Sequence, residues 1–422
     1  MPKIKQVAAR VILNAKGNPA IEATVVLDND YYGIASCPAG TSVGIYEAVS
    51  LYDKDPLHFK GKGVFTAIQN IQNLLAPKLV GMEATKQQVV DRAMIELDGT
   101  QNKSRVGANA ILAVSMAVAK AAAASSGKPL FLYLREFLSS QDIATKIPTP
   151  MFSLLNGGVL ASKNLDFQDF LLIPTTSTPY GTSLEMGLRA YEGMRDVLLE
   201  HNFSTLVTEQ GGFSPQIPVN QDAIILVLDA AQRGALRLGF EVFLGIDAAA
   251  THFHSGQQYK IKDHDQVMSS KVLNDFYIDK VKQYHILYLE DPLSEDDWDG
   301  WIDLTARLVK EAIVSGDDLT ATNPYRLQMA IDKRAITGIT IKPNQIGTVI
   351  ETLALVEVAK AAGIKVTVSS RSGETTDDFI ADFAVAVGAD YVKFGAPVRG
   401  EHVTKYNRLL QIDSQIKQLA HV

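Results

Sequence analysis

The sequence predicts an α/β protein in two parts: an N-terminal α+β domain over residues 1–138 and a C-terminal α/β barrel over residues 139–422. The first part has strand-like runs followed by helical runs, an order typical of α+β domains. Beyond residues 148–150, strand-like and helical runs alternate, and the strand ends recur roughly every 25 to 45 residues, as in the βα units of a parallel barrel. A doubly wound open sheet is the alternative, although no glycine-rich phosphate turn opens its first unit.

The N-terminal part is expected to begin with an antiparallel meander. Its three strands cover residues 4–13, 21–27 and 31–37, and the turns between them are rich in glycine, asparagine and aspartate. In the second strand, apolar residues alternate with polar ones, which indicates a half-buried strand. Helical runs follow from residue 63 to residue 139, and the alanine-rich run at 108–124 is typical of a helix packed closely on its neighbours.

The composition of the chain limits which partners the protein can bind and in which cellular compartment it is expected. The net charge of −7 provides no basic surface for nucleic acid or an anionic membrane. The only cysteine is Cys37, so no internal disulfide can form, and a reducing, cytoplasmic compartment is expected. The N-terminus has no apolar signal core, and no uncharged run approaches the length of a membrane span.

A short apolar run at Gly338–Ile341 stops at Lys342, and Pro343 lacks the backbone donor that would continue the strand. Apolar residues at helical spacing follow, so Lys342 is expected at the carboxyl end of a barrel strand, just before a helix. Catalytic residues of α/β barrels stand at this end. The ordinary alternative is a surface lysine whose aliphatic stem lies on apolar neighbours.

Four other apolar runs also stop at charged side chains. These are Asp247, Glu290 with Asp291, Asp317 with Asp318, and Lys393. Carboxyl ends of parallel strands meet at one mouth of a barrel, so the carboxylates and both lysines are expected to converge. Carboxylate oxygens suit a hard divalent cation such as Mg²⁺. A lysine beside bound cations has the lowered pKa that a general base needs.

Several motifs, taken in order along nearly the whole chain, resemble the enolase family. They are Lys16–Pro19 (KGNP), Leu97–Thr100 (LDGT), Gly107–Leu112 (GANAIL), Leu155–Gly158 (LNGG), Glu290–Leu293 (EDPL), Gly316–Leu319 (GDDL), Lys342–Thr348 (KPNQIGT), Arg371–Thr375 (RSGET) and Lys393–Pro397 (KFGAP). Each motif alone is weak evidence, but the ordered set is specific for the family.

The resemblance implies an eight-stranded barrel with irregular first strands, a homodimer or higher oligomer, and a carbon–oxygen lyase of glycolysis. Its reaction is the Mg²⁺-dependent dehydration of 2-phosphoglycerate, a small phosphorylated hydroxy acid, to phosphoenolpyruvate. By position, Lys342 removes the C2 proton and Lys393 binds near the substrate carboxylate. Gln168 lines the pocket and Arg371 and Ser372 hold the phosphate. The implied magnesium ligands are Asp247, Glu290, Asp317 and, from a glycine-containing loop at 38–44, Ser42.

The acid side of the expected pocket departs from the family pattern. Gln210 stands where the family has the glutamate that protonates the leaving hydroxide, and an amide can donate a hydrogen bond but supplies no proton. Leu160 and Ser370 replace two histidines, and Asp169 replaces a longer glutamate. Glu209, one residue from Gln210, would have to be re-aimed to act as the acid.

Three interpretations remain open at the level of sequence. The chain is an enolase with weakened or rerouted acid catalysis. Alternatively, it forms the same enolate from another phosphorylated or phosphonylated acid. A third possibility is a non-catalytic binding or scaffold protein that kept the fold, because a fold does not by itself imply a function.

Overall fold

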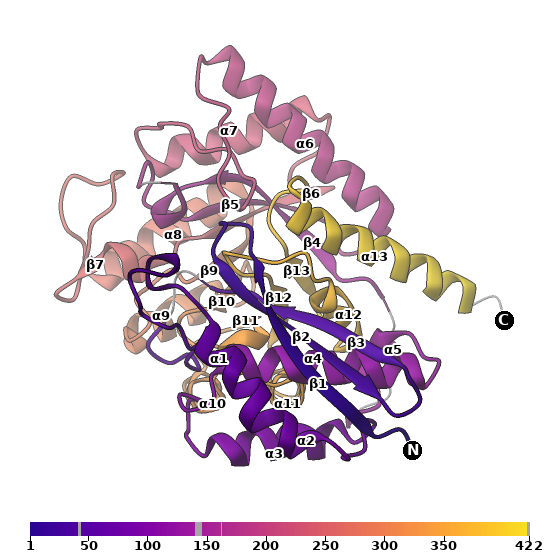
Figure 1. Ribbon diagram of the computed structural model, residues 1–422. Helices are drawn as coiled ribbons and strands as arrows, with labels where there is room; N and C mark the ends of the chain where they lie inside the picture. The colour runs from indigo at the N-terminus through magenta and orange to yellow at the C-terminus, as the bar shows by residue number, and fades with distance from the viewer. Residues whose placement is uncertain (41–43, 140–145, 162, 420–422) are drawn as a thin grey trace.

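The computed structural model describes residues 1–40, 44–139, 146–161 and 163–419. A three-stranded sheet with its helices lies against a closed barrel, which has its own helices on the outside (Figure 1). The predicted fold class is confirmed, and the doubly wound open sheet is wrong because the strands close into a barrel. The domain boundary at residues 138 and 139 stays a prediction.

The N-terminal sheet is the predicted antiparallel meander in the order β1-β2-β3. Its strands are β1 (Ile4–Leu13), β2 (Pro19–Leu27) and β3 (Tyr32–Cys37). The helical segments that follow are η1 (Phe59–Gly61), α1 (Phe65–Asn70), the π-helical η2 (Ile71–Leu75), α2 (Ala76–Leu79), α3 (Gln87–Asp98), α4 (Ala108–Ser125) and α5 (Leu130–Arg135). One face of β2 carries Ala23, Val25 and Leu27, which are fully buried in the core.

Helix α4 packs directly on the sheet because both surfaces carry small residues. A Cβ atom at Gly33 of β3 would lie 2.2 Å from the carbonyl oxygen of Ala117 and 2.5 Å from the nitrogen of Ala121. Only glycine therefore permits this approach of strand and helix. The helix is long and apolar enough to span a membrane, but 83% of it is buried within the protein, as expected of a core helix.

The barrel strands follow one another in the closed order β10-β11-β12-β13-β4-β5-β6-β9. They are β4 (Thr149–Asn156), β5 (Asp169–Pro174), β6 (Val242–Asp247), β9 (Ile286–Glu290), β10 (Ile313–Gly316), β11 (Gly338–Ile341), β12 (Lys365–Ser369) and β13 (Tyr391–Lys393). Strand β5 runs antiparallel to both neighbours, while the other adjacent pairs are parallel. This is the irregular beginning that the family resemblance implied.

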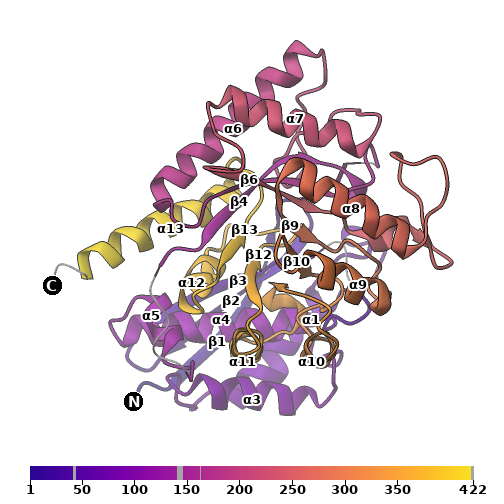
Figure 2. The same cartoon turned by 180° about the vertical axis from the view of Figure 1, so that it is seen from behind.

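The outer helices of the barrel are seen best from the other side (Figure 2). They are α6 (Tyr180–Glu200), α7 (Asn220–Arg233), α8 (Ser270–Tyr284), α9 (Trp298–Leu308), α10 (Pro324–Lys333), α11 (Val349–Ala361), α12 (Phe379–Ala386) and α13 (Gly400–Leu419). Short segments lie in the loops that follow barrel strands: η3 (Gly158–Ala161) after β4, η4 (Ala250–Phe253) and the small hairpin β7 (His254–Ser255) with β8 (Gln258–Tyr259) after β6, and η5 (Pro343–Gln345) after β11. Side-chain caps fix where several helices begin, as at Asn323 before α10 and Thr348 before α11.

The two parts of the molecule share a buried polar contact. Asp91 of α3 accepts a hydrogen bond from the backbone nitrogen of Ile350, at the first turn of α11. Ser115 of α4 accepts one from the nitrogen of Val349 and donates its own hydroxyl hydrogen to Asp91. Two backbone donors at the start of a barrel helix are thus satisfied by the N-terminal part. Helix α11 follows the strand that ends at Lys342, so this contact helps to position the site.

Candidate active site

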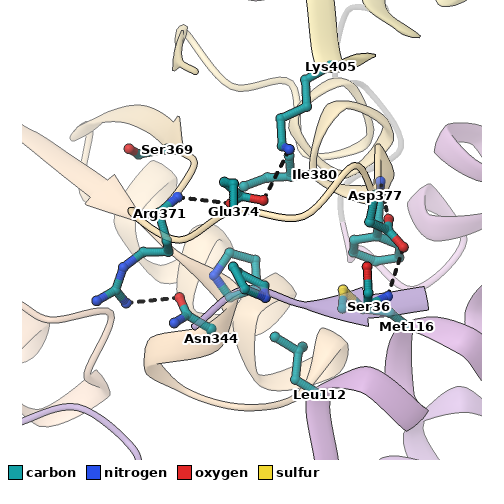
Figure 3. Close-up of a pocket in the computed structure, with 13 residues that line it drawn as sticks. Ser36, Leu112, Met116, Asn344, Ser369, Arg371, Glu374, Asp377, Ile380 and Lys405 are labelled. Atoms are coloured by element: carbon teal, nitrogen blue, oxygen red, sulfur yellow. Dashed lines mark hydrogen bonds and ion pairs between the residues drawn. The ribbon is translucent and has the colours of Figure 1, made fainter. Parts of the chain in front are cut away.

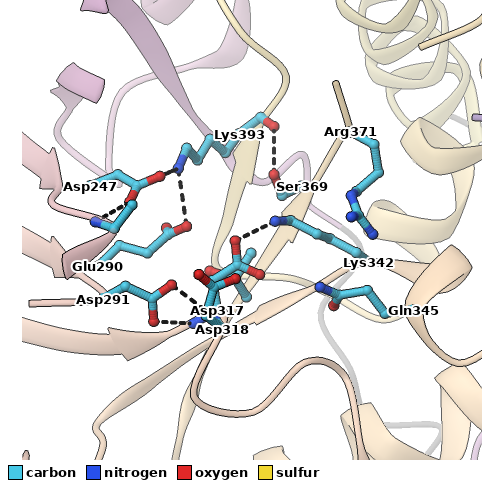
Figure 4. A network of polar contacts seen from close by, with 12 residues as sticks. Asp247, Glu290, Asp291, Asp317, Asp318, Lys342, Gln345, Ser369, Arg371 and Lys393 are labelled. Atoms are coloured by element: carbon cyan, nitrogen blue, oxygen red, sulfur yellow. Dashed lines mark hydrogen bonds and ion pairs between the residues drawn. The ribbon is translucent and has the colours of Figure 1, made fainter. Parts of the chain in front are cut away.

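Charged side chains gather at the carboxyl end of the barrel, as the strand-end pattern predicted. Asp247 and Glu290 are the last residues of the neighbouring strands β6 and β9 and pair in register. Asp317 directly follows β10, Lys342 directly follows β11, and Lys393 ends β13. Parallel strands in a barrel place all these ends on the same face, and Figure 4 shows the side chains pointing toward one another there.

One pocket at this mouth is lined by nearly all the predicted site residues. They are Leu160, Gln168, Asp169, Gln210, Asp247, Asp317, Lys342, Ser370, Arg371, Ser372 and Lys393, joined by Ser369, which the sequence analysis did not single out. Glu290 is fully buried and adjoins the pocket through Lys393. Ser42 lies outside the described residues.

The two lysines each hold carboxylates (Figure 4). The Nζ atom of Lys393 lies 2.6 Å from Asp247 Oδ2 and 3.0 Å from Glu290 Oε1, and Lys342 forms a close ion pair with Asp317. Burial is the strongest single influence on Lys342 and lowers its pKa, but the charge and hydrogen bond of Asp317, together with the charge of Glu290, outweigh burial and raise the pKa above its ordinary value. The lowered pKa expected from the sequence concerns a site with bound cations, and it stays a prediction.

In the barrel interior, Tyr288 forms hydrogen bonds with the carboxylate cluster and with a neighbouring strand. Its hydroxyl group donates to Glu290 Oε2 at 2.7 Å and lies 3.0 Å from the hydroxyl of Ser315. Burial raises the pKa of Glu290 to about 7, because the nearby Lys393 only partly offsets the loss of solvent. A buried carboxylate with a raised pKa gains from additional positive charge close by.

The donor set fits a magnesium ion. Asp317 Oδ1 is buried and lacks a hydrogen-bond partner among the described residues, so one carboxylate oxygen is available for a metal. Two of the other predicted ligands, Asp247 and Glu290, are also buried carboxylates, the oxygen donors that Mg²⁺ prefers. The cluster therefore suits a divalent cation in charge and in ligand type.

A second set of carboxylates lies beside the predicted one. Oxygen atoms of Asp291, Asp317 and Asp318 all lie within 4.8 Å of one another. Both oxygens of Asp291, however, accept backbone hydrogen bonds, from the nitrogens of Asp317 at 3.0 Å and Asp318 at 2.8 Å. These bonds shape the turn that presents Asp317, and the choice between this set and the one that includes Asp247 and Glu290 stays a prediction.

The opposite wall of the pocket carries Arg371 in a loop that follows β12. Its backbone nitrogen donates to Glu374 Oε1 at 2.9 Å, and Glu374 is itself paired with Lys405 of α13 at 3.1 Å (Figure 3). The guanidinium group donates to Asn344 and forms an ion pair with Glu47 of the N-terminal part. The arginine is thus held from several elements, and Ser372 lies next to it in the pocket lining.

Comparison with known proteins identifies the architecture. Residues 144–422 match the sequence model of the enolase C-terminal TIM barrel domain, and residues 4–134 match that of the enolase N-terminal domain. The chain belongs to the enolase family. The enolase of Acidothermus cellulolyticus is 43% identical over 420 residues, a match that covers 100% of this chain and 96% of that protein. The resemblance inferred from the motifs is confirmed.

Gln210, the residue predicted to occupy the position of the general acid, belongs to a network of hydrogen bonds. Gln210 lines the pocket, and its backbone nitrogen donates to Thr208 Oγ1 at 3.1 Å. Thr208 in turn donates to Asn156, whose amide donates to Asp169 Oδ1 at 2.9 Å. Ser153 holds the other oxygen of Asp169 at 2.7 Å. The Asp169 carboxylate is therefore fixed by hydrogen bonds, and it is connected to Gln210 through neutral groups.

Glu209 is not aimed into the pocket. Its Oε1 atom lies 2.8 Å from Nζ of Lys16, which belongs to the turn between β1 and β2, and Glu209 is absent from the pocket lining. The idea that Glu209 replaces the missing acid therefore requires this ion pair to break. Leu160, Ser370 and Gln210, three of the positions predicted to depart from the family pattern, all line this one pocket.

Proposed function

We propose that this enolase-family chain is a Mg²⁺-dependent hydro-lyase that converts 2-phospho-D-glycerate to phosphoenolpyruvate. The observation that carries the proposal is the position of Lys342. It is a half-buried lysine at a barrel mouth, beside Asp317 and in the same pocket as Arg371 and Lys393. This arrangement offers a base and a cluster of carboxylates that can bind metal. It also offers two positively charged side chains, Arg371 and Lys393, for an anionic substrate.

Each residue has a distinct role in the proposed reaction. Lys342 takes the proton from C2, and Lys393 contacts the substrate carboxylate. Arg371 with Ser372 binds the phosphate, and Gln168 lines the pocket. Asp247, Glu290 and Asp317 would hold magnesium, with Ser42 as a further ligand. A C2 proton next to a carboxylate is weakly acidic, because its removal places a second negative charge on that group. Bound magnesium supplies positive charge that stabilises this dianion and compensates the carboxylate beside Lys342.

A second candidate substrate has its own supporting observation. Gln210, Leu160 and Ser370 lie together in the pocket lining, on the side where the leaving group of 2-phosphoglycerate would be protonated. A different phosphorylated or phosphonylated acid whose leaving group needs no carboxylic acid would suit this wall. Both candidates use the same base and the same metal ligands. The non-catalytic interpretation predicts no exchange of a proton at any acid.

The first test is an assay of the purified protein with magnesium and 2-phosphoglycerate, following phosphoenolpyruvate by its ultraviolet absorbance. We expect slow but measurable formation that stops when a chelator is added and returns with excess Mg²⁺. The same preparation is then offered other phosphorylated and phosphonylated 2-hydroxy acids. A faster reaction with one of these acids, and none with 2-phosphoglycerate, would favour the second candidate.

The proposed assembly is a homodimer or a higher oligomer in the cytoplasm. The assembly rests on the family, and the location rests on the absence of disulfides and on Cys37, which is buried as a free thiol. We expect light scattering at micromolar concentration to give at least twice the mass of 45.9 kDa for one chain. A monomer under these conditions would contradict the proposed assembly.

A further inference from the structure

Arg371 is engaged by a carboxylate from the N-terminal part of the molecule. Its Nη1 atom donates to Glu47 Oε2 at 2.9 Å and its Nη2 atom donates to Glu47 Oε1 at 3.2 Å. The side chains of both residues are only 4% exposed. A two-point pair of this kind combines charge neutralisation with a fixed orientation of the guanidinium plane.

Glu47 reaches the arginine from outside the catalytic pocket. Arg371 lines that pocket and Glu47 does not, whereas Glu47 lines a separate pocket formed by residues of both parts of the molecule. Asn344 accepts a further hydrogen bond from Nη1 at 2.9 Å (Figure 3). A substrate phosphate arriving from the pocket would therefore meet a guanidinium group whose charge is already compensated from behind.

Glu47 is also fixed in place by its own surroundings. The backbone nitrogen of Gly44 donates to Glu47 Oε1 at 2.9 Å. At Gly40, a Cβ atom would lie 2.9 Å from Nη2 of Arg371, so the backbone passes directly over the guanidinium group. The carboxylate and the arginine are thus enclosed together, and the backbone at Gly40 and Gly44 lies against the pair.

We propose that Glu47 sets the phosphate affinity of the site by neutralising Arg371 when no phosphate is bound. The inference rests on the proposed function, in which Arg371 binds the phosphate. A buried arginine without a counter-charge is unfavourable, and an arriving phosphate relieves that cost. With Glu47 present, the charge of Arg371 is already neutralised, so phosphate binding gains little free energy from neutralising it. The Glu47 carboxylate also repels the negatively charged phosphate. The pair therefore keeps phosphate binding loose enough for substrate to enter and product to leave.

The test measures the dissociation constant of inorganic phosphate by calorimetry, with magnesium present. Glu47→Gln removes the charge while keeping the size of the side chain, and we expect phosphate to bind about tenfold more tightly than to the unmodified protein. Glu47→Asp keeps the charge on a shorter side chain and should show no tightening. Glu47→Ala removes the charge by a second route and should also bind phosphate more tightly. The alanine variant therefore still tests the inference if the glutamine variant does not fold.

Two controls separate this role from general stability and from binding elsewhere. Glu351→Gln breaks another ion pair between the two parts, with Lys103 at 3.0 Å, and should leave the phosphate affinity unchanged. Adding Arg371→Gln to Glu47→Gln should abolish the tightening, which would locate the phosphate at this arginine.

Unchanged or weaker binding in both neutral variants would overturn the inference, because a carboxylate that only positions Arg371 should weaken phosphate binding when it is lost. The proposed function would stand in that case. If phosphate shows no Arg371-dependent binding to the unmodified protein or to any Glu47 variant, the phosphate site itself is wrong and both proposals fail.

Discussion

Asp247→Ala and Asp317→Asn variants are expected to lose turnover completely and to bind Mg²⁺ roughly a hundredfold more weakly or worse. Each change removes a charged oxygen donor from a buried site, and too few remain to hold a hard cation. The Asp317 change also removes the carboxylate that pairs with Lys342, so the charge balance of the base is lost as well. Calorimetry with MgCl₂ on the folded variants measures the affinity directly.

The neighbouring carboxylate Asp318 provides the matched control. If the ion is held by Asp247, Glu290 and Asp317, an Asp318→Asn variant should keep most of its magnesium affinity. If it is held by the adjacent set of Asp291, Asp317 and Asp318, the asparagine variant loses the ion and Asp247→Ala keeps it. Unchanged affinity in both Asp247→Ala and Glu290→Ala proteins would show that the predicted ligand assignment is wrong.

The second large effect is expected in the rates of the two half-reactions, removal of the C2 proton and elimination of hydroxide, which should differ widely. Lys342 and the metal ligands are present, so the C2 proton of 2-phosphoglycerate should exchange with deuterated water. Gln210 cannot protonate the leaving hydroxide, so elimination should be slower than exchange by about 10² to 10⁴, the usual contribution of a positioned general acid. Nuclear magnetic resonance of the substrate measures exchange, and absorbance measures phosphoenolpyruvate in the same sample.

Three variants test this separation. Lys342→Ala should lose exchange and elimination together, because it removes the base. Gln210→Glu should recover part of the elimination rate, but not all of it, since Leu160 and Ser370 still replace the histidines. Lys16→Met releases Glu209 from its ion pair at 2.8 Å, and a gain in elimination would reveal that carboxylate as a reserve acid. Elimination as fast as exchange in the unmodified protein would contradict our interpretation of Gln210.

The sequence predicted the residues of the pocket well because of a simple rule of topology. Parallel strands that close into a barrel bring their carboxyl ends together, so Asp247, Lys342 and Lys393 could be placed on one mouth from strand boundaries alone. The roles assigned by family position stay predictions, and Ser42 lies outside the described residues. The missed residue Ser369 ends β12, one position before Ser370, and the same rule could have found it.

The supporting pairs could not be predicted in this way. Glu47 and Arg371 are 324 positions apart, and neither lies at a matching point of a repeating unit. Glu209 meets Lys16 across the two parts of the molecule for the same reason, and no periodicity in the sequence indicates that contact. Hydrogen bonding and charge neutralisation specify such pairs only after the two parts have packed together.

The polar contact that Asp91 and Ser115 make with α11 has a consequence for the independence of the two parts. If the N-terminal part were removed, the first backbone donors of α11 would lose their hydrogen-bond acceptors. The surface of the barrel that the N-terminal part now buries would become exposed. The barrel is therefore not a module that could be cut out and keep its catalytic geometry. Loosening of the N-terminal part would propagate to the helix behind Lys342, and the two parts should lose their structure in one cooperative transition.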